Sequence, residues 1–413
     1  MDAEQQHAAS PHRFRLKGTS AEDYLESLAR KSFFVDWCFR SPRLPDGREL
    51  CDLLIVFDRT AVIWQAKDLQ LDAVGRYKVA EVDKNLRQLV GARRQLMELK
   101  TPVDLENARR ARERFDPTAI DEVFLVSALL GEGEEVFSMV ESVKSHTVHV
   151  FTRAFTEIAL GELDTISDFV QYLKTKERFL TTKTGSLVLL GGEENLLAFY
   201  LLNDRSFDRL HGPHDVTMED GHWEQLCIDP RFTARKAADQ ISYAWDSIVD
   251  RAHEGSTQYE RVARELARPN RFERRTLAQS FYDSHVRAHE ETIHHIFRRF
   301  TVGRDPAPGR QTTYCFLFMD ESLPREDRRQ MLHAMCLVAR DLRPQNHWVI
   351  GVATEKHLKP TCSYDFALLH FPTWPDEMKV AATKLREELG IFKDPEITET
   401  SEDEYPGPTT AEG

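Results

Sequence analysis

Cysteine and long apolar runs are both scarce in this chain of 413 residues, and each scarcity excludes a class of protein. The six cysteines form no C-x-x-C pair, so we expect reduced thiols of a cytoplasmic protein rather than disulfides or a zinc site. No window reaches the about 18 consecutive apolar residues of a membrane span, so we expect no membrane partner. The first dozen residues lack the apolar core of a secretion signal. The sequence contains neither a G-x-G-x-x-G nor a G-K-[ST] phosphate loop, so we expect no ATP motor in this chain.

A surplus of basic residues is also missing. The formal net charge is −13, and Asp394–Gly413 holds seven acidic residues and no basic one. The first 100 residues are the exception, with 17 Lys and Arg against 15 Asp and Glu. An acidic protein is not an obvious high-affinity partner of a polyanion, but this distribution is compatible with a basic groove in the first 100 residues.

The length and the distribution of apolar residues indicate two folded domains. Residues 174–185 are polar and predict a linker or an exposed turn. The part before it has α-β-β-β-α-β character, and the part after it is expected to be mixed α/β with a helical insert. The expected organisation is a disordered start at 1–14, a first domain at 15–175, a second domain at 186–392 and a disordered acidic tail at 393–413.

Apolar periodicity predicts the individual elements. Apolar residues three and four apart predict helices at 18–34, 79–96, 135–144, 155–173, 324–341 and 376–389. Apolar stretches bounded by turn formers predict strands at 33–39, 122–130, 147–151, 313–319, 347–354 and 365–371, and a hairpin at 51–67. The predicted fold class is therefore α/β.

The hairpin carries polar side chains at its open end. Asp52 opens the first strand, and Gln65 and Lys67 close the second. Buried strands rarely carry such groups unless the groups are paired or used. Asp52 shares a face with the other two only if the connecting loop has an even number of residues. The two loops considered are Arg59-Thr60 and residues 58–61.

Oxygen donors and an amine at one point suit the metal-assisted hydrolysis of phosphodiesters. The Asp52 side chain, the Gln65 amide and the Ala66 carbonyl would be oxygen ligands of a hard divalent cation. The preceding helix would supply a further ligand, either Glu22 or Glu26. The amine that ends the second strand would polarise the attacking water and stabilise charge on the phosphate.

These residues resemble the PD-(D/E)XK nuclease superfamily, particularly its Mrr-like restriction-endonuclease branch, in which Gln often replaces one acid. That branch opens with a helix of the form G-x-x-x-E, which Gly18 and Glu22 match. The resemblance therefore implies Glu22 as the ligand from this helix, with Glu26 as second choice. It commonly has a Gly-Gly lead-in to its metal-binding Asp, whereas residues 48–51 before Asp52 are Arg-Glu-Leu-Cys. The resemblance covers residues 15–100 and extends at most to 173.

The resemblance implies a fold, a cofactor and a substrate. The fold is a restriction-endonuclease-like αβββαβ core, the cofactor is Mg²⁺ or Mn²⁺, and the substrate is nucleic acid, with DNA favoured over RNA. The activity is that of an endonuclease, in the manner of restriction or anti-phage defence effectors. The residues matched to the family's catalytic positions are Glu22, Asp52, Gln65 and Lys67.

The helix after the hairpin carries basic residues on its polar sides. A solvated face is the ordinary explanation, and contact with phosphates is the functional one. The candidates for such contact are Lys84, Arg87 and Gln88. His285 and His289 have the spacing of a helical metal pair, but they do not form H-E-x-x-H, so we expect a structural or surface role.

Two other interpretations stay open. In one, Asp52 and Lys67 form only a strand-end ion pair, and the chain is a non-catalytic scaffold or interaction protein that keeps the nuclease fold. In the other, the protein is a ribonuclease. In the leading interpretation as a nuclease, the second domain would serve target sensing, formation of a homo-oligomer or binding of a partner protein.

Overall fold

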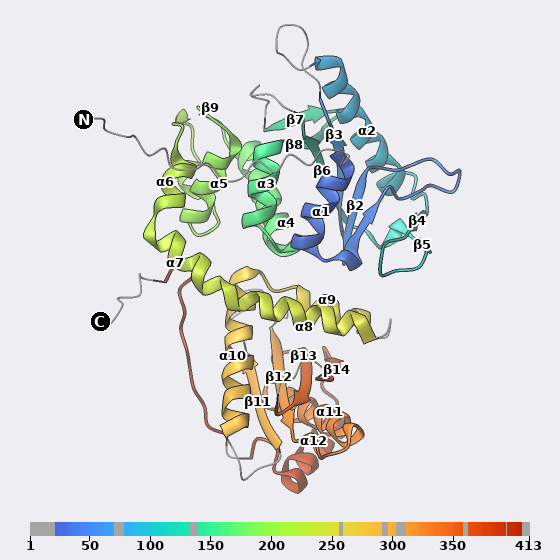
Figure 1. The fold of residues 1–413 in the computed structure, drawn as a ribbon, viewed down its shortest axis with the longest axis vertical. Helices are drawn as coiled ribbons and strands as arrows, with labels where there is room; N and C mark the ends of the chain where they lie inside the picture. Colours follow the sequence, from blue (N-terminus) through green and yellow to red (C-terminus); the bar gives the residue numbers. More distant parts are fainter. Residues whose placement is uncertain are drawn as a thin grey trace, which may run out of the picture. The chain divides into compact units, whose positions relative to one another are not determined.

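The chain is mixed α/β and divides into two compact units (Figure 1). Unit 1 consists of Met1–Lys31 and Trp37–Arg153, and unit 2 of Ser32–Asp36 and Ala154–Gly413. In the described residues, no helix combines the length and the apolar character needed to cross a membrane. The computed structural model describes residues 21–69, 78–131, 139–255, 259–290, 296–302, 311–357, 362–393 and 395–406.

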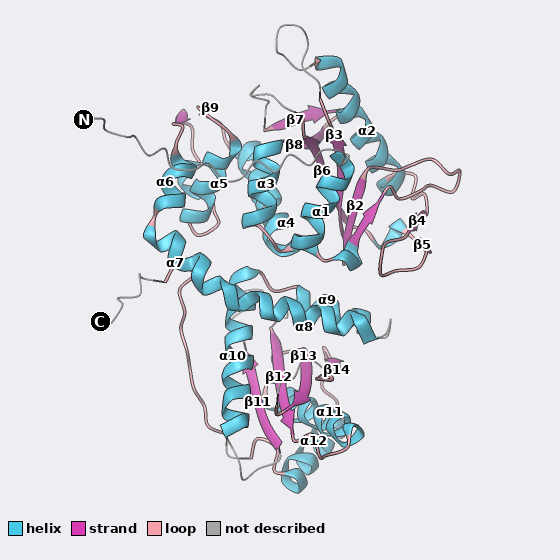
Figure 2. Ribbon diagram, viewed as in Figure 1, coloured by secondary structure: helices cyan, strands magenta, loops and turns pink. Residues whose placement is uncertain are grey.

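A six-stranded mixed sheet forms the centre of unit 1 (Figure 2). Its elements are most of helix α1 (Ala21–Phe33), helix α2 (Val79–Met97) and strands β1 (Cys38–Arg40), β2 (Leu53–Phe57), β3 (Thr60–Lys67), β6 (Glu122–Leu129), β7 (Val140–Val143) and β8 (His146–Thr152). The strand order is β1-β2-β3-β6-β8-β7. The first three strands form an antiparallel meander, β3, β6 and β8 are parallel, and β7 is antiparallel to β8. A small hairpin of β4 (Val103–Leu105) and β5 (Glu113–Phe115) lies outside this sheet.

The hairpin of β2 and β3 forms because both strands are apolar on both faces. All five residues of β2 are buried, and so are residues 61–64 of β3. Leu86 and Leu89 of the amphipathic helix α2 pack with Leu54 and Ile63 in one apolar core. Because both faces are apolar, the length of the connecting turn rather than the apolar pattern fixes the register of the hairpin.

Unit 2 combines a helical part with a second, four-stranded sheet. The sheet has the order β11-β12-β13-β14, formed by Ile296–Val302, Thr312–Met319, Trp348–Glu355 and Asp365–His370, and only β12 and β13 are parallel. β9 (Leu187–Leu189) and β10 (Val216–Met218) form a separate parallel pair. The helices are α3 (Arg153–Glu162), α4 (Ile166–Thr182), α5 (Glu193–Leu202), α6 (His222–Ile228), α7 (Pro230–Ala238), α8 (Ser242–Gly255), α9 (Glu260–Ala267), α10 (Arg271–Glu290), α11 (Arg325–Leu342) and α12 (Asp376–Leu389).

The strongly patterned elements are confirmed to within two residues. They combine clear periodicity with a continuous buried face, which is the signal that sequence alone carries best. They are the helices α2, α11 and α12 and the strands β6, β8, β12, β13 and β14.

Three element predictions were wrong. The helix expected at 135–144 is replaced in its described part by strand β7, which pairs with β8; residues 132–138 lie outside the described residues. The helix expected at 155–173 is two helices, α3 and α4, which are separate because Thr165 caps the start of α4. The strand expected at 33–39 is limited to Cys38–Arg40, and Val35–Trp37 forms a 3₁₀ helix instead.

The linker expected at 174–185 is largely helical, since α4 continues to Thr182. Its Lys, Glu and Arg residues are good helix formers, and the segment is anchored from within. Phe179 is fully buried, and the buried Lys176 ammonium lies 2.5 Å from the Glu193 carboxylate. Lys176 is buried because it pairs with a residue outside this segment, and the polarity of the segment alone does not reveal such a contact.

The division of the chain differs from the expected domains. The first domain was expected at 15–175, whereas unit 1 ends at Arg153, so that α3 and α4 belong to unit 2. The expected start at 1–14 lies outside the described residues. The tail that was expected to be disordered is described at 395–406, where it has no helix or strand but is held by ion pairs to unit 2.

Candidate active site

The turn of the hairpin is Asp58-Arg59, because Phe57 pairs with Thr60. The loop therefore has an even number of residues, as the sequence argument required, but neither of the two loops considered there is the observed one. The tighter turn is accommodated by Asp58, whose φ of 53° lies in the left-handed region that Asp tolerates better than most residues.

This register brings the polar ends of the two strands together. Continued by one residue beyond the pair Leu53–Trp64, it places Asp52 opposite Gln65. Because side chains alternate along a strand, Lys67 points to the same face as Gln65. The three side chains that the sequence singles out thus share one face of the sheet.

The Asp52 carboxylate is bound to the end of β3. Its Oδ1 accepts a hydrogen bond from Nε2 of Gln65 at 2.5 Å, and its Oδ2 accepts one from the backbone N–H of Ala66 at 2.7 Å. Only 8% of Asp52 is exposed. Because the N–H and C=O of one strand residue point to the same side, the Ala66 carbonyl also faces the side of β3 on which Asp52 lies. A carboxylate, an amide and a carbonyl therefore meet at this point.

Burial raises the pKa of the Asp52 carboxyl from 3.8 to about 7. The negative charges of Glu22 and Glu49 raise this pKa further, whereas the hydrogen bonds from Ala66 and Gln65 lower it because they favour the charged form. The opposing hydrogen bonds are too weak to restore the ordinary pKa. Asp52 is thus a buried acid in a negative electrostatic field, and such a field favours a cation.

The acidic residues of α1 gather around Arg40 of β1. The Arg40 guanidinium contacts Glu22, Asp23 and Glu26. Glu22 is 40% exposed and lies 3.4 Å from Arg40, whereas Glu26 is also held by Arg30 at 2.7 Å. Of the two candidate ligands on this helix, Glu22 is the one whose charge is among the main causes of the raised Asp52 pKa.

Sequence reasoning missed Glu49, whose charge also acts on Asp52. It lies in the loop before β2, where no strand alternation assigns a side chain to a face. No three His, Cys, Asp or Glu side chains within the described ranges converge closely enough to hold a metal ion. Oxygens of Gln65 and Ala66 would therefore have to complete any coordination shell around Asp52 and Glu22.

Lys67 is the last residue of β3 and is half-buried. Its ammonium has no hydrogen bond or ion pair with the described parts of the chain. Its backbone is fixed, since its carbonyl accepts a hydrogen bond from the N–H of Leu130 at 2.9 Å. Gly131 lets the segments that follow β3 and β6 approach each other, because a Cβ there would lie 2.1 Å from the backbone oxygen of Leu69. Lys67 is thus held by its backbone, and its amine is unpaired as far as the described residues go.

A buried polar contact beneath the site was also missed from the sequence. Asn85 of α2 is 1% exposed, and its Oδ1 accepts a hydrogen bond from the Ser127 hydroxyl of β6 at 2.7 Å. Its Nδ2 lies 3.4 Å from the backbone oxygen of Gln65. This contact ties α2 and β6 to the strand end that bears the site. A lone Asn among the apolar positions of a predicted helix was the available signal.

Lys84, Arg87 and Gln88 are exposed on α2. No ion pair or hydrogen bond to other described residues engages their side chains. They are therefore free to contact a ligand, which is equally true of an ordinary solvated face.

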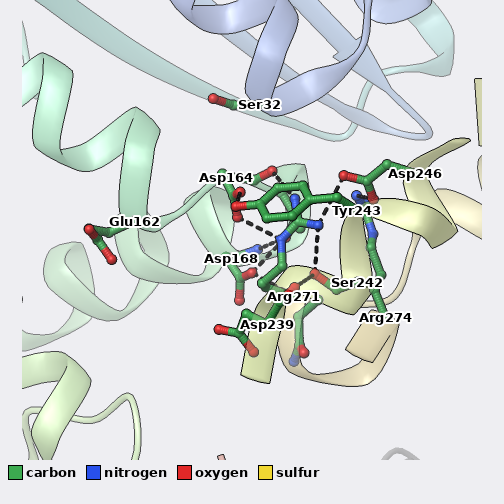
Figure 3. Close-up of polar contacts among 12 residues, drawn as sticks. Ser32, Glu162, Asp164, Asp168, Asp239, Ser242, Tyr243, Asp246, Arg271 and Arg274 are labelled. Carbon is green, nitrogen blue, oxygen red and sulfur yellow. Dashed lines mark hydrogen bonds and ion pairs between the residues drawn. The ribbon is translucent and has the colours of Figure 1, made fainter. Parts of the chain in front are cut away.

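A second concentration of polar groups lies within unit 2 (Figure 3). Arg271 Nε lies 2.8 Å from Asp164, and both Arg271 and Arg274 bind Asp246 at 2.9 and 2.8 Å. The Tyr243 hydroxyl donates a hydrogen bond to Asp164 at 2.8 Å. Because these buried charges are paired with one another, the network is better suited to holding helices together than to chemistry.

The histidines of α10 are in contact with backbone and aromatic groups. His285 Nε2 lies 2.7 Å from the backbone oxygen of Lys356, and the His289 ring lies 4.8 Å from that of His357. Burial lowers the pKa of His285. These contacts fit the structural role expected from the sequence.

The chemistry of the candidate active site is thus defined by the residues of this chain itself. Compared with family models, curated proteins and solved structures, the chain matches none.

Proposed function

We propose that this protein is a metal-dependent endonuclease that hydrolyses phosphodiester bonds at the open end of the β2–β3 hairpin. The observation that supports it most directly is the buried Asp52 carboxylate beside the Gln65 amide and the Ala66 backbone. The succession α1-β1-β2-β3-α2-β6, with β3 and β6 parallel, also agrees with the αβββαβ core of the nucleases that this segment resembles. We therefore assign unit 1 a restriction-endonuclease-like core as part of the proposal.

The donor set fits Mg²⁺ or Mn²⁺, since hard cations prefer oxygen ligands. The Asp52 and Glu22 carboxylates and the Ala66 carbonyl would hold the ion, and Gln65 would add an oxygen once its amide turns away from donating to Asp52. The negative field that raises the Asp52 pKa favours this binding. The ion would supply Lewis-acid polarisation of the phosphate and a lowered pKa of bound water.

Lys67 would act on the reacting phosphate directly. Its ammonium would donate hydrogen bonds to a non-bridging phosphate oxygen and orient the attacking water on the face shared with Asp52. Positioned charge of this kind stabilises the transition state because it need not reorganise during the reaction. The hydrogen bond from Leu130 to the Lys67 carbonyl keeps the amine at the strand end.

The substrate in this proposal is nucleic acid, with DNA preferred to RNA by the family resemblance. Lys84, Arg87 and Gln88 of α2 would contact phosphates flanking the scissile bond. Unit 2 would sense the target, bind a partner protein or form a homo-oligomer, in the manner of a defence effector in the cytoplasm. The resemblance of fold and motif, rather than a bound ligand, supports this part.

The test is a cleavage assay with labelled single-stranded DNA, double-stranded DNA and RNA. The purified protein should cut at least one of them with Mg²⁺ or Mn²⁺, and EDTA should abolish cleavage. Comparing the three substrates decides between deoxyribonuclease and ribonuclease action. Absence of cleavage with either metal on every substrate would contradict the proposal.

Replacing Arg87 and Lys84 by Gln should weaken nucleic-acid binding without altering specificity. Each phosphate contact releases counterions, so losing two should reduce the slope of log affinity against log salt by about 1.4 to 1.8. The slope is measured by fluorescence anisotropy between about 50 and 300 mM salt, a range that includes physiological ionic strength. Ca²⁺ replaces Mg²⁺ in these experiments to prevent cleavage. An unchanged slope would identify this helix face as merely solvated.

A non-catalytic scaffold is the second candidate. It is favoured by the two hydrogen bonds that already satisfy Asp52 and by the lack of three converging acidic or histidine ligands in the described residues. In that case the protein would bind nucleic acid or a partner with equal affinity in Mg²⁺ and in EDTA. Titration of Mg²⁺ against thermal stability separates the two candidates, since only the nuclease is expected to be stabilised by the metal.

A further inference from the structure

The acidic C-terminal segment Glu402–Tyr405 is bound to three arginines of unit 2. These are Arg205 after α5, Arg235 of α7 and Arg275 of α10, which we call the arginine socket. The side chains of Arg235 and Arg275 are 5% and 4% exposed, and that of Arg205 is 16% exposed. Buried guanidinium groups of this kind require anionic partners.

The Glu404 carboxylate is the shared partner of two of these arginines. Its Oε1 lies 2.8 Å from Nη2 of Arg205 and 3.7 Å from Nη1 of Arg235. Arg275 donates to the backbone carbonyl of Asp403 at 2.6 Å and to that of Glu404 at 3.3 Å, and its Nε lies 3.4 Å from the Glu402 carboxylate. Side-chain and main-chain contacts together specify an extended acidic peptide.

Tyr405 adds an aromatic anchor next to the carboxylate. Its hydroxyl donates a hydrogen bond to the backbone oxygen of Leu201 at 3.0 Å. The Arg235 guanidinium lies 5.5 Å from the centroid of its ring, within the range of a cation–π contact. The socket therefore distinguishes an acidic-aromatic pair from an acidic residue alone.

The socket carries one positive charge more than the body of unit 2 neutralises. Its three arginines and the adjacent Lys236 contact three acids of the body: Glu162, Asp168 and Asp239. The neighbouring Arg271 and Arg274 are balanced by Asp164 and Asp246 (Figure 3). The segment supplies the remaining negative charge, through Glu404 at Arg205 and Arg235 and through the more exposed Glu402 at Arg275.

The chain that leads to the socket is exposed. After Phe392, which is buried in the core of the four-stranded sheet, the chain runs back to α7 (Figure 1). All described residues from Pro395 to Asp403 are exposed. Before Glu402, the Glu396 carboxylate lies 3.7 Å from the Arg287 guanidinium at the surface. The segment is thus bound to the socket through residues 402–405, whereas the residues before them are exposed to solvent.

We propose that the arginine socket is a binding site for an acidic-aromatic peptide of the Asp-Glu-Tyr type, and that the chain's own Glu402–Tyr405 is its resident, releasable ligand. The tether keeps the resident segment at an effective concentration in the millimolar range, so a free peptide competes poorly with it. A partner protein would enter the socket by displacing this segment. The site is independent of the proposed nuclease chemistry.

The test uses the full chain and a fluorescein-labelled synthetic peptide of residues 400–406. The double variant Glu404→Gln/Tyr405→Ala weakens the resident ligand and should bind this peptide saturably in fluorescence anisotropy. The wild-type chain should bind it at least about tenfold more weakly, which is the smaller end of the effect expected for a charge-assisted hydrogen bond. A peptide with the same two substitutions should bind neither protein.

Glu396→Gln is the matched control, since it removes a surface contact of the same segment and leaves the socket occupied. It should behave like the wild type. Equal binding of both peptides, or no saturable binding by a double variant that unfolds at the wild-type temperature, would overturn the proposal.

A second measurement applies if the double variant does not fold. A protease recognition sequence replaces the exposed residues 397–400 in the otherwise unaltered chain, and the purified protein is then cut there. The released C-terminal fragment should co-elute with the body in gel filtration and be displaced by an excess of the synthetic peptide. Immediate separation of the fragment from a folded body would overturn the proposal.

Discussion

Lys67→Ala is expected to lower metal-dependent cleavage by about 100- to 1000-fold, the range observed when one positioned donor to a developing negative charge is removed. The amine of Lys67 has no partner among the described residues, so its loss should leave the folded state intact. The thermal unfolding midpoint should therefore stay within about 1 °C, because no hydrogen bond or ion pair with the described residues is lost. Initial rates on a labelled oligonucleotide, with substrate in excess, measure the effect.

The control for this prediction is Lys31→Ala, which removes an exposed lysine from α1 in the same unit. It changes the net charge equally but should cleave at the wild-type rate. Lys67→Arg should recover only part of the activity, since a planar guanidinium does not reproduce the point charge of an ammonium. If Lys67→Ala protein retains the full wild-type rate, the cleavage comes from a contaminant or from another site.

The hairpin was predictable because its physics is local. Two apolar strands separated by polar turn residues predict an antiparallel hairpin, in which side chains alternate between the two faces. Whether Asp52 shares a face with Gln65 and Lys67 then depends only on whether the loop has an even number of residues. The exact turn was not predictable by the same logic, since Asp58 adopts a left-handed conformation that sequence only permits. The predicted shared face is nevertheless correct, because the observed loop also has an even number of residues.

The rest of the site depends on contacts that no local pattern encodes. Asn85 meets Ser127 across 42 residues, and Glu49 acts on Asp52 from a loop without periodicity. The socket is a stronger case, because Glu404 lies 199 residues from Arg205 in sequence. A polar tail of this kind is ordinarily predicted to be disordered. Here it is held by buried arginines that are distant from it in sequence, and a local sequence pattern does not reveal them.

Asp52→Asn is expected to stabilise the protein above pH 7 while it abolishes metal binding. A carboxyl whose pKa rises from 3.8 to about 7 on folding holds a proton in the folded state that the unfolded state has lost. Stability therefore falls as the pH rises from about 4 to about 7 and stays low above it. The cost of charging this group in the folded state is on the order of 4 kcal/mol at pH 8.

Asparagine avoids this cost and keeps the local geometry. Its Oδ1 would accept the hydrogen bond from the Ala66 N–H, and its Nδ2 would donate to Gln65 once that amide turns over. Urea unfolding should therefore show a gain of about 2 to 4 kcal/mol at pH 8 and little difference at pH 4. The control is Asp46→Asn, since Arg48 lowers the pKa of that exposed carboxyl and the variant should gain nothing.

The response to Mg²⁺ shows whether the free-energy cost of burying the Asp52 charge serves metal binding. A metal that binds the folded wild type raises its unfolding free energy with concentration, and it does so more strongly at pH 8 than at pH 6 because the charged carboxylate is the ligand. Asp52→Asn should show no such rise. A variant that is less stable than the wild type at pH 8, or that still responds to Mg²⁺, would mean that Asp52 is a stabilising strand-end acid, and the scaffold interpretation would replace the nuclease.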